Sequence, residues 1–313
     1  MNSQQRVRAA LRGEPVDRVP FSVYVHSKAE NRGVQEFAEF TLAFHRRFRP
    51  DYVKAMYDEN YDTPVNFQFA TDLSVWGRLE ELDPHRGGFG RQLESLKLIR
   101  DAVGPDTPVI QTLYSPSHWG VRLAWRTILE HWKLEPELVQ RGLGVIARNL
   151  AAFGRCAVEE VGIDGFMFGA YGCEPAWLSE DGYRALAMPH DRAVLAALRP
   201  GALLLLHIHG EQGSYFDLLK DYDVDALSWE DRLAGPTLAE ARRRTGKCLI
   251  GGVDHLRALA ARPDEVRAEA LDAIRQTEGR GFILAPGCTF DDHTPEANVR
   301  ALGEASEYVG IGD

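Results

Sequence analysis

The stretch ALLLLHIHG at residues 202–210 decides the fold class. Its apolar residues run on without the polar alternation of a half-solvated strand, which is typical of a strand buried on both faces of a parallel sheet. Side chains alternate between faces along a strand. One face therefore bears only leucine and isoleucine near its end, while His207 and His209 share the other. We expect the apolar face to pack on helices and both imidazoles to point into the mouth of a barrel.

Similar apolar stretches recur along the chain and alternate with segments of helical period, which is typical of βα units around a parallel sheet. The usual length of a closed (β/α)₈ barrel is ~250 residues, and the 313 residues here fit one such TIM-type barrel better than an open doubly wound sheet. We therefore predict a single α/β barrel domain over residues 1–313. The candidate strands are residues 19–24, 51–56, 108–114, 165–169, 202–210, 225–231, 248–254 and 281–287.

The residues beyond the usual length of such a barrel lie after the second candidate strand. The segment between Asp58 and the helix expected near Leu93 is much longer than the ~2–6 residues of an ordinary βα loop. We interpret it as an insertion between the second strand and the second helix that covers the barrel mouth as a lid.

Composition excludes several classes of function. The formal net charge of −10 argues against a surface for nucleic acid or for anionic membranes, since either needs clustered Lys and Arg. No run approaches the ~20 apolar residues that span a bilayer, and the start MNSQQRVRAALRGE is too polar for a secretory signal, so we expect a cytoplasmic protein. The four cysteines are too widely spaced for a disulfide framework. Cys156 and Cys248 are interpreted as core residues.

Chemistry in such a barrel is expected at the C-terminal ends of the strands. His207 and His209 end the fifth candidate strand, and Cys288 follows the eighth. Catalytic zinc usually takes three protein ligands from N, S and O atoms and keeps one position open. The three side chains are therefore a candidate metal site, with Glu174, Cys173 or Glu211 as alternative fourth ligands. The competing interpretation is a hydrogen-bonding histidine pair beside a small buried cysteine.

Other polar and aromatic residues fall at the same strand ends. Candidate catalytic residues are Asp58, Glu174 and Asp231, and candidate cofactor-binding or pocket-wall residues are Tyr114, His118 and Trp229. The carboxylates have ordinary structural alternatives. An aspartate at a strand end commonly caps the next helix. The cluster SWEDR at 228–232 is equally consistent with a simple salt bridge to Arg232.

Three segments resemble the uroporphyrinogen decarboxylase superfamily: RVRAALRGEPVDRVP at 6–20, LSEDGYRALAMPHDRAVLAAL at 178–198 and GFILAPGCTFDDHTPEANVRAL at 281–302. The similarity extends essentially from end to end, and the last segment is the most specific. The resemblance implies a (β/α)₈ fold. It also implies one of two chemistries, either cofactor-free decarboxylation of the acetate arms of a tetrapyrrole or zinc-dependent methyl transfer between a corrinoid and a thiol or related acceptor.

The residues differ from the decarboxylase pattern. Decarboxylases of this superfamily have an arginine-rich motif after the first strand, whereas the matching stretch FSVYVHSKAENRG at 21–33 offers only Lys28 and Arg32 as cations. Cys288 stands where the decarboxylases have a histidine. Asp58, however, matches their catalytic aspartate.

The methyltransferases resemble the chain more closely, because they take zinc from a His-x-Cys pair and a later Cys. His207, His209 and Cys288 occupy those positions, with one Cys replaced by His. The exchange of a thiolate for a neutral imidazole makes the site one unit more positive. The resemblance therefore implies a zinc-dependent methyltransferase that moves a methyl group between a corrinoid, as methylcobalamin or a corrinoid protein, and a small acceptor. The alternatives are a metal-free decarboxylase that relies on Asp58 and a non-catalytic corrinoid or tetrapyrrole binder.

Overall fold

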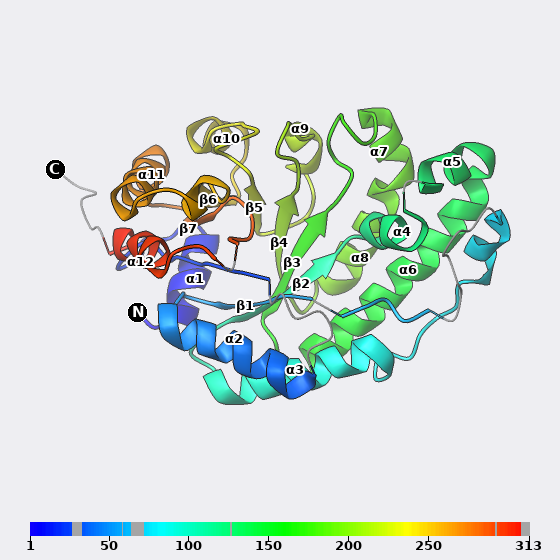
Figure 1. The fold of residues 1–313 in the computed structure, drawn as a ribbon, viewed down its shortest axis with the longest axis horizontal. Helices are drawn as coiled ribbons and strands as arrows, with labels where there is room; N and C mark the ends of the chain where they lie inside the picture. Colours follow the sequence, from blue (N-terminus) through cyan, green and yellow to red (C-terminus); the bar gives the residue numbers. More distant parts are fainter. Residues whose placement is uncertain (27–32, 58, 64–71, 126, 292, 308–313) are drawn as a thin grey trace.

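The computed structural model describes residues 1–26, 33–57, 59–63, 72–125, 127–291 and 293–307. Within this part of the chain, seven strands form one parallel sheet in which every strand pairs with the next in sequence, in the order β1 to β7. Helices surround the sheet, as Figure 1 shows. The strands are β1 (Val53–Ala55), β2 (Val109–Tyr114), β3 (Gly165–Ala170), β4 (Leu203–Ile208), β5 (Ala226–Trp229), β6 (Cys248–Val253) and β7 (Phe282–Pro286).

The helical segments mostly follow the alternation with strands that the sequence predicts. They are α1 (Ser3–Leu11), α2 (Val34–Phe48), η1 (Leu73–Arg78), α3 (Gly87–Val103), α4 (Pro116–Ala124), α5 (Thr127–Leu134), α6 (Pro136–Cys156), η2 (Ala157–Val161), α7 (Glu180–Leu186), α8 (Met188–Leu198), α9 (Phe216–Leu219), α10 (Leu238–Arg244), η3 (Arg257–Leu259), α11 (Pro263–Thr277) and α12 (Glu296–Ala305).

The α/β class with a parallel sheet is confirmed, but the expected first strand at 19–24 is not among the seven. Phe21 forms an isolated bridge with Leu284, and Val25, just after the expected strand, forms another with Phe290. The segment still lies beside β7, because the Ser22 N–H donates to the Leu284 carbonyl, and beside the residues before β1, because the Asp51 N–H donates to the Phe21 carbonyl. Pro20 has no N–H, so a continuous ladder is interrupted there.

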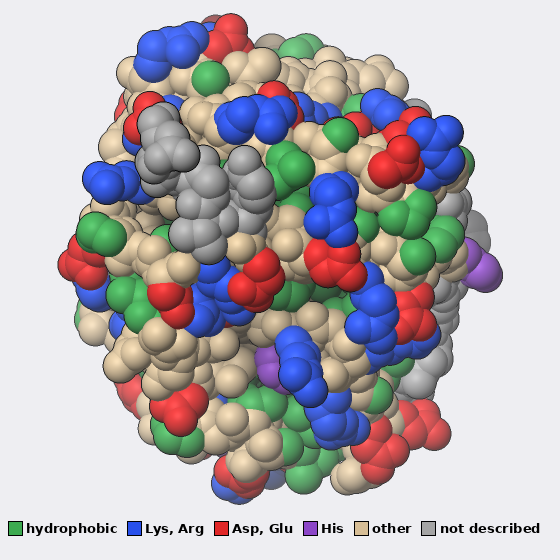
Figure 2. Space-filling view, turned by 90° about the vertical axis from the view of Figure 1, so that its left-hand side faces the viewer, with side chains coloured by type: hydrophobic (Ala, Val, Ile, Leu, Met, Phe, Trp, Pro, Cys, Tyr) green, Lys and Arg blue, Asp and Glu red, His purple; other side chains and the backbone are tan. Residues whose placement is uncertain are grey.

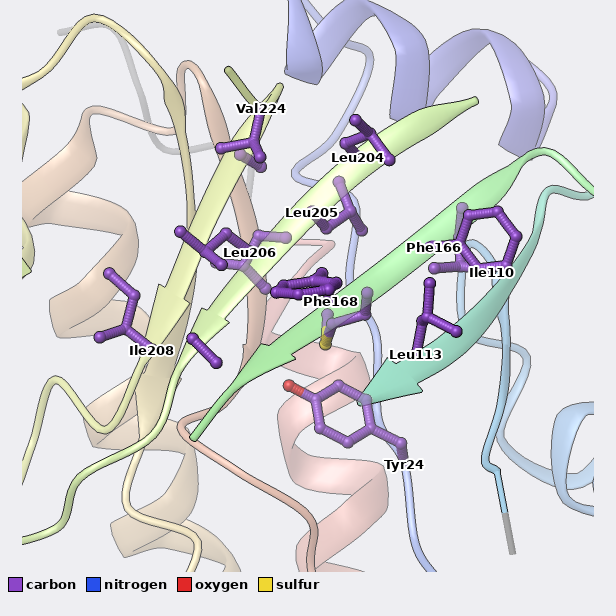
Figure 3. Close-up of a cluster of buried hydrophobic side chains, with 14 of the residues drawn as sticks. Tyr24, Ile110, Leu113, Phe166, Phe168, Leu204, Leu205, Leu206, Ile208 and Val224 are labelled. Carbon is purple, nitrogen blue, oxygen red and sulfur yellow. The ribbon is translucent and has the colours of Figure 1, made fainter. Parts of the chain in front are cut away.

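The stretch 202–210 folds as its pattern predicts. Leu204, Leu206 and Ile208 are fully buried on the face of β4 that meets the helices. Leu205 and His207 belong to the opposite face, and Figure 3 shows the leucines of β4 beside Phe166 and Phe168 of β3. Both faces of the central strands are thus covered, as in other parallel sheets.

The described part of the insertion after β1 packs against α5 and α6 rather than over the pocket. Trp76 of η1 is buried and its Nε1–H donates to His131 Nδ1. The side chain of Asn149 on α6 accepts from the Leu82 N–H and donates to the Glu80 carbonyl. None of the described insertion residues lines the pocket at the sheet end. The lid stays a prediction, since residues 64–71 lie outside the described residues.

On the face seen in Figure 2, acidic and basic side chains are interspersed. Among the helices of the described residues, none combines the length and the apolar composition that crossing a bilayer requires.

Candidate functional site

A pocket of about 200 Å³ opens at the C-terminal ends of the strands. Its position agrees with the rule that parallel α/β sheets bind ligands at the carboxyl ends of their strands. Aromatic and apolar side chains form most of its wall. The pocket is lined by Tyr24, His26, Lys54, Met56, Thr112, Tyr114, His118, Met167, Gly169, Ala170, Tyr171, His207, His209, Cys288 and Thr289.

His207, His209 and Cys288 meet at the base of this pocket although their strands are not neighbours. His207 is on β4, His209 follows it, and Cys288 lies just beyond β7, with β5 and β6 between. Together with Glu230, they offer one ligand atom each, and these atoms all lie within 4.8 Å of one another. The loops after β4 and β7 therefore both lean over the sheet end.

Hydrogen bonds orient each imidazole by its Nδ1 atom. His207 Nδ1 lies 3.3 Å from the Ser228 hydroxyl, and Ser228 is the residue that pairs with His207 across β4 and β5. His209 Nδ1–H donates to Glu230 Oε1 at 2.8 Å. The other carboxylate oxygen of Glu230 accepts the Gly210 N–H at 3.0 Å. The Nε2 atoms of both rings are thus left for the cluster.

The electrostatics of the cluster favour a thiolate. Burial alone raises the pKa of Cys288, but the neighbouring His207 and His209 outweigh it and hold that pKa well below its ordinary value. The hydrogen bonds of His209 to Cys288 and Glu230 raise the pKa of His209 to about 11 despite its burial. Burial also acts to raise the pKa of Glu230, and the bond from His209 reverses this and lowers it. A buried network of opposite charges results.

These residues fit a zinc-class cation. His207 Nε2 is buried and makes no hydrogen bond with the described residues, while Glu230 Oε1 lies 3.7 Å from it. Two imidazole nitrogens, a sulfur and a carboxylate oxygen are the donors that zinc prefers. A carboxylate on Nδ1, as Glu230 provides for His209, is a usual way in which ligating histidines are fixed.

The sequence interpretation did not include Glu230 in the metal site. It named Asp231 of the motif SWEDR as a catalytic candidate and gave a simple salt bridge to Arg232 as the alternative. The carboxylate of Asp231, the next residue, makes its contacts outside the cluster. Asp231 Oδ1 accepts the Gly252 N–H at 2.9 Å, its Oδ2 lies 3.6 Å from Arg232 Nε, and it does not line the pocket. The period of two could have found Glu230, since it follows Ser228 on the same face.

Two of the three predicted pocket-wall residues line the pocket and the third does not. Tyr114 and His118 line the pocket, with their rings stacked at 4.2 Å. Burial lowers the pKa of His118 to about 3, so that ring is neutral. Trp229 does not line the pocket. It is fully buried, contacts Phe216, and donates its Nε1–H to the Pro236 carbonyl. Tyr171, which lies 6.0 Å from His209 in a stacked arrangement, is a wall residue that the interpretation did not single out.

The three proposed fourth ligands lie outside the cluster. The Cys173 thiol is buried and donates to the His209 carbonyl at 3.2 Å. Glu174 is half-buried, and burial raises its pKa. Glu211 lies 3.5 Å from His255 Nε2. Asp58 is outside the described residues, so its catalytic assignment stays a prediction.

Comparisons with known proteins add family information to this geometry. The uroporphyrinogen decarboxylase (URO-D) family model matches residues 53–308. Methylcobamide:CoM methyltransferase MtaA of Methanosarcina barkeri is 26% identical over 337 aligned residues, covering 96% of this chain and 96% of that protein. Uroporphyrinogen decarboxylase of Prochlorococcus marinus is 25% identical over 227 residues, covering 69% of this chain and 63% of that protein. A solved structure, a methyltransferase from Methanosarcina mazei, has a TM-score of 0.83 at 21% identity and covers 98% of both chains.

The structural likeness at this identity establishes the shared fold. The methyltransferase from M. barkeri aligns with nearly the whole chain, whereas the decarboxylase aligns with a shorter part. The family match spans most of the sequence, including the cluster residues on β4 and just after β4, β5 and β7. The chain therefore belongs to the uroporphyrinogen decarboxylase family.

Proposed function

We propose that the protein is a zinc-dependent methyltransferase that moves a methyl group between a corrinoid and a small thiol or related acceptor. The observation that supports this most is the convergence of His207, His209 and Cys288 in the wall of one pocket, with the buried Glu230 beside them. The full-length relatives named as methylcobamide:CoM methyltransferases support the choice of reaction.

In this proposal His207 Nε2, His209 Nε2 and Cys288 Sγ hold the metal. Zinc, when bound, supplies Lewis acidity that lowers the pKa of an acceptor thiol so that the thiolate forms at neutral pH. Glu230 either orients His209 or adds a fourth donor. An imidazole replaces the second thiolate of the methyltransferase pattern, and the carboxylate of Glu230 supplies the negative charge that this replacement removes.

The pocket residues select and orient the acceptor. Tyr114, His118 and Tyr171 form an aromatic wall on one side and exclude water from the reacting atoms. A volume of about 200 Å³ suits a small acceptor and is too little for a whole corrinoid. The methyl donor, free methylcobalamin or a corrinoid protein, would therefore approach from the open mouth.

A decarboxylase acting on a tetrapyrrole with several carboxylates needs several cations. Among the described residues that line the pocket, Lys54 is the single lysine and there is no arginine. The ammonium of Lys54 lies over the Tyr24 ring, 4.2 Å from its centroid. This lining favours methyl transfer over decarboxylation.

The test measures metal content and methyl transfer together. We expect purified protein to bind one zinc through these residues, and His207→Ala and Cys288→Ala each to lose it. Glu230→Gln should weaken zinc binding by roughly 10- to 100-fold, because the partner of His209 is changed. With methylcobalamin as donor and CoM or a simple alkyl thiol as acceptor, demethylation of the corrinoid is expected in the zinc-loaded wild type and in the control variant, and is expected to be lost in His207→Ala and Cys288→Ala. His293→Ala, which removes an exposed histidine outside the cluster, serves as the control.

Two results would contradict the proposal. Unchanged zinc content in His207→Ala and Cys288→Ala would remove the ligand assignment. Decarboxylation of a tetrapyrrole carboxylate that persists after complete chelation and is lost in Asp58→Asn would support the metal-free alternative instead.

A further inference from the structure

A second group of metal-binding side chains lies outside the pocket. His85, Cys156 and Glu160 each present one ligand atom, and these atoms all lie within 4.8 Å of one another. His85 Nε2 is 2.9 Å from Glu160 Oε2, and the Cys156 thiol hydrogen-bonds the same carboxylate. None of the three lines the pocket at the strand ends.

The three residues come from two places in the fold. His85 precedes α3, whereas Cys156 is the last residue of α6 and Glu160 lies in η2, a π-helical turn that continues α6. Residues four apart on a helix share one face, which places the thiol and the carboxylate side by side. π-Helical turns inside helices are rare and are frequent at functional sites. His85 and Glu160 are 75 residues apart, so a bound ion would join distant segments.

A neighbouring carboxylate orients the histidine. Asp83 Oδ1 accepts the His85 N–H at 3.0 Å and lies 3.4 Å from the ring atom Nδ1. The other ring nitrogen, Nε2, faces the cluster. A carboxylate on one nitrogen and the cluster on the other is the arrangement that ligating histidines usually have.

The surrounding charges and dipoles favour a cation. Cys156 and Glu160 lie at the C-terminal end of a continuous helical segment that ends at Val161, where the partial charge of the helix is negative. Glu159 and Asp83 add negative charge nearby. Arg155 and Arg86 are the adjacent cations, and Arg86 is paired with Asp83 at 3.3 Å.

We propose that His85, Cys156 and Glu160 form a second site for zinc or a zinc-like divalent ion, which braces the start of α3 against the end of α6. The donor set of one nitrogen, one sulfur and one oxygen selects borderline ions such as Zn²⁺ and Co²⁺ and disfavours Mg²⁺ and Ca²⁺, which take oxygen ligands. His85 and Glu160 are exposed and Cys156 is half-buried, so water would complete the coordination. The site is independent of the reaction proposed for the pocket.

The experiment strips the full-length protein with chelator, reloads it with micromolar Zn²⁺, and counts bound zinc after dialysis. Cys156→Ser and His85→Ala are each expected to lose one equivalent, Cys288→Ser to lose a different one, and the double variant Cys156→Ser/Cys288→Ser to lose both. Glu159→Gln, next to the cluster and exposed, is the matched control for Glu160→Gln and should keep full binding. Zinc should raise the melting temperature of Cys288→Ser but not that of the double variant.

Each outcome decides between the two sites. If the pocket binds no metal, wild type still retains one equivalent that is sensitive to Cys156→Ser and insensitive to Cys288→Ser. The second site is refuted if Cys156→Ser and His85→Ala retain wild-type zinc, if Glu159→Gln loses as much as Glu160→Gln, or if the extra equivalent appears only at millimolar zinc.

Discussion

At the scale of single residues, Asp191 shows how burial couples to pH. Its side chain is fully buried, and its Oδ2 accepts hydrogen bonds from the Tyr183 hydroxyl at 2.6 Å and the Tyr222 hydroxyl at 3.1 Å. Its Oδ1 is buried without a hydrogen-bond partner in the described residues. Burial raises the pKa of Asp191 from 3.8 to about 7, although the two tyrosines act in the opposite direction.

The sign of the effect on stability follows from proton binding. Between about pH 4 and pH 7 the folded protein keeps the Asp191 proton while the unfolded chain loses it, so this residue lowers stability as pH rises through that window. Asp191→Asn cannot titrate. We expect its stability relative to wild type to improve by roughly 2–3 kcal/mol from pH 5 to pH 8. Urea unfolding of both proteins at the two pH values measures this, and a pH-independent difference would contradict it.

At the scale of elements, the sequence predicted each of the seven strands of the described residues, and it was wrong on the segment 19–24. The sequence places β3, β4 and β7 to within about two residues, because their apolar runs are covered on both faces. The segment 19–24 has the same composition but forms only an isolated bridge, since Pro20 interrupts it and its neighbour β1 has three residues. Pairing with a short strand is a tertiary property that a pattern along one segment does not contain.

Close approach between β3 and β4 depends on one glycine. A Cβ at Gly165 would lie 2.0 Å from the carbonyl oxygen of Leu203, a backbone atom held by the pairing of the two strands. Gly165→Ala should therefore destabilise the protein by about 1–3 kcal/mol or more. Gly246→Ala is the control, because nothing lies within 4 Å of the added carbon there and its change should be about 0.5 kcal/mol or less. Equal urea midpoints for both variants would contradict the steric argument.

At the scale of the whole molecule, the candidate site was predictable where a strand pattern pointed to it. His207 and His209 are on the pocket face that alternation predicts, and Cys288 follows β7 as expected. Their assignment as metal ligands stays a prediction. Trp229 does not line the pocket, because side chains alternate along β5 and Ser228 rather than Trp229 faces His207. The second metal cluster joins residues 75 apart, and no local pattern predicts such a contact.

The N-terminal segment is attached to the sheet by one buried charge network. Asp51, fully buried before β1, accepts from Arg6 of α1 at 2.6 Å, from Arg18 at 2.7 Å and from the Phe21 N–H at 2.8 Å. Asp17 shares Arg6 but is partly exposed. Arginine is always protonated, so removal of the Asp51 charge leaves two guanidinium groups without their buried counter-ion.

Asp51→Asn is therefore expected to cost about 3–5 kcal/mol of folding free energy, as is usual when one partner of a buried ion pair is removed. Asp17→Asn should cost about 1 kcal/mol or less, because water screens its exposed carboxylate. Urea unfolding measures both, and limited proteolysis should cut the first 20 residues of Asp51→Asn before the rest of the chain. If the two variants unfold at the same midpoint, α1 and the 19–25 segment are held by their apolar contacts and other hydrogen bonds, and the charge network is not what joins them to the sheet.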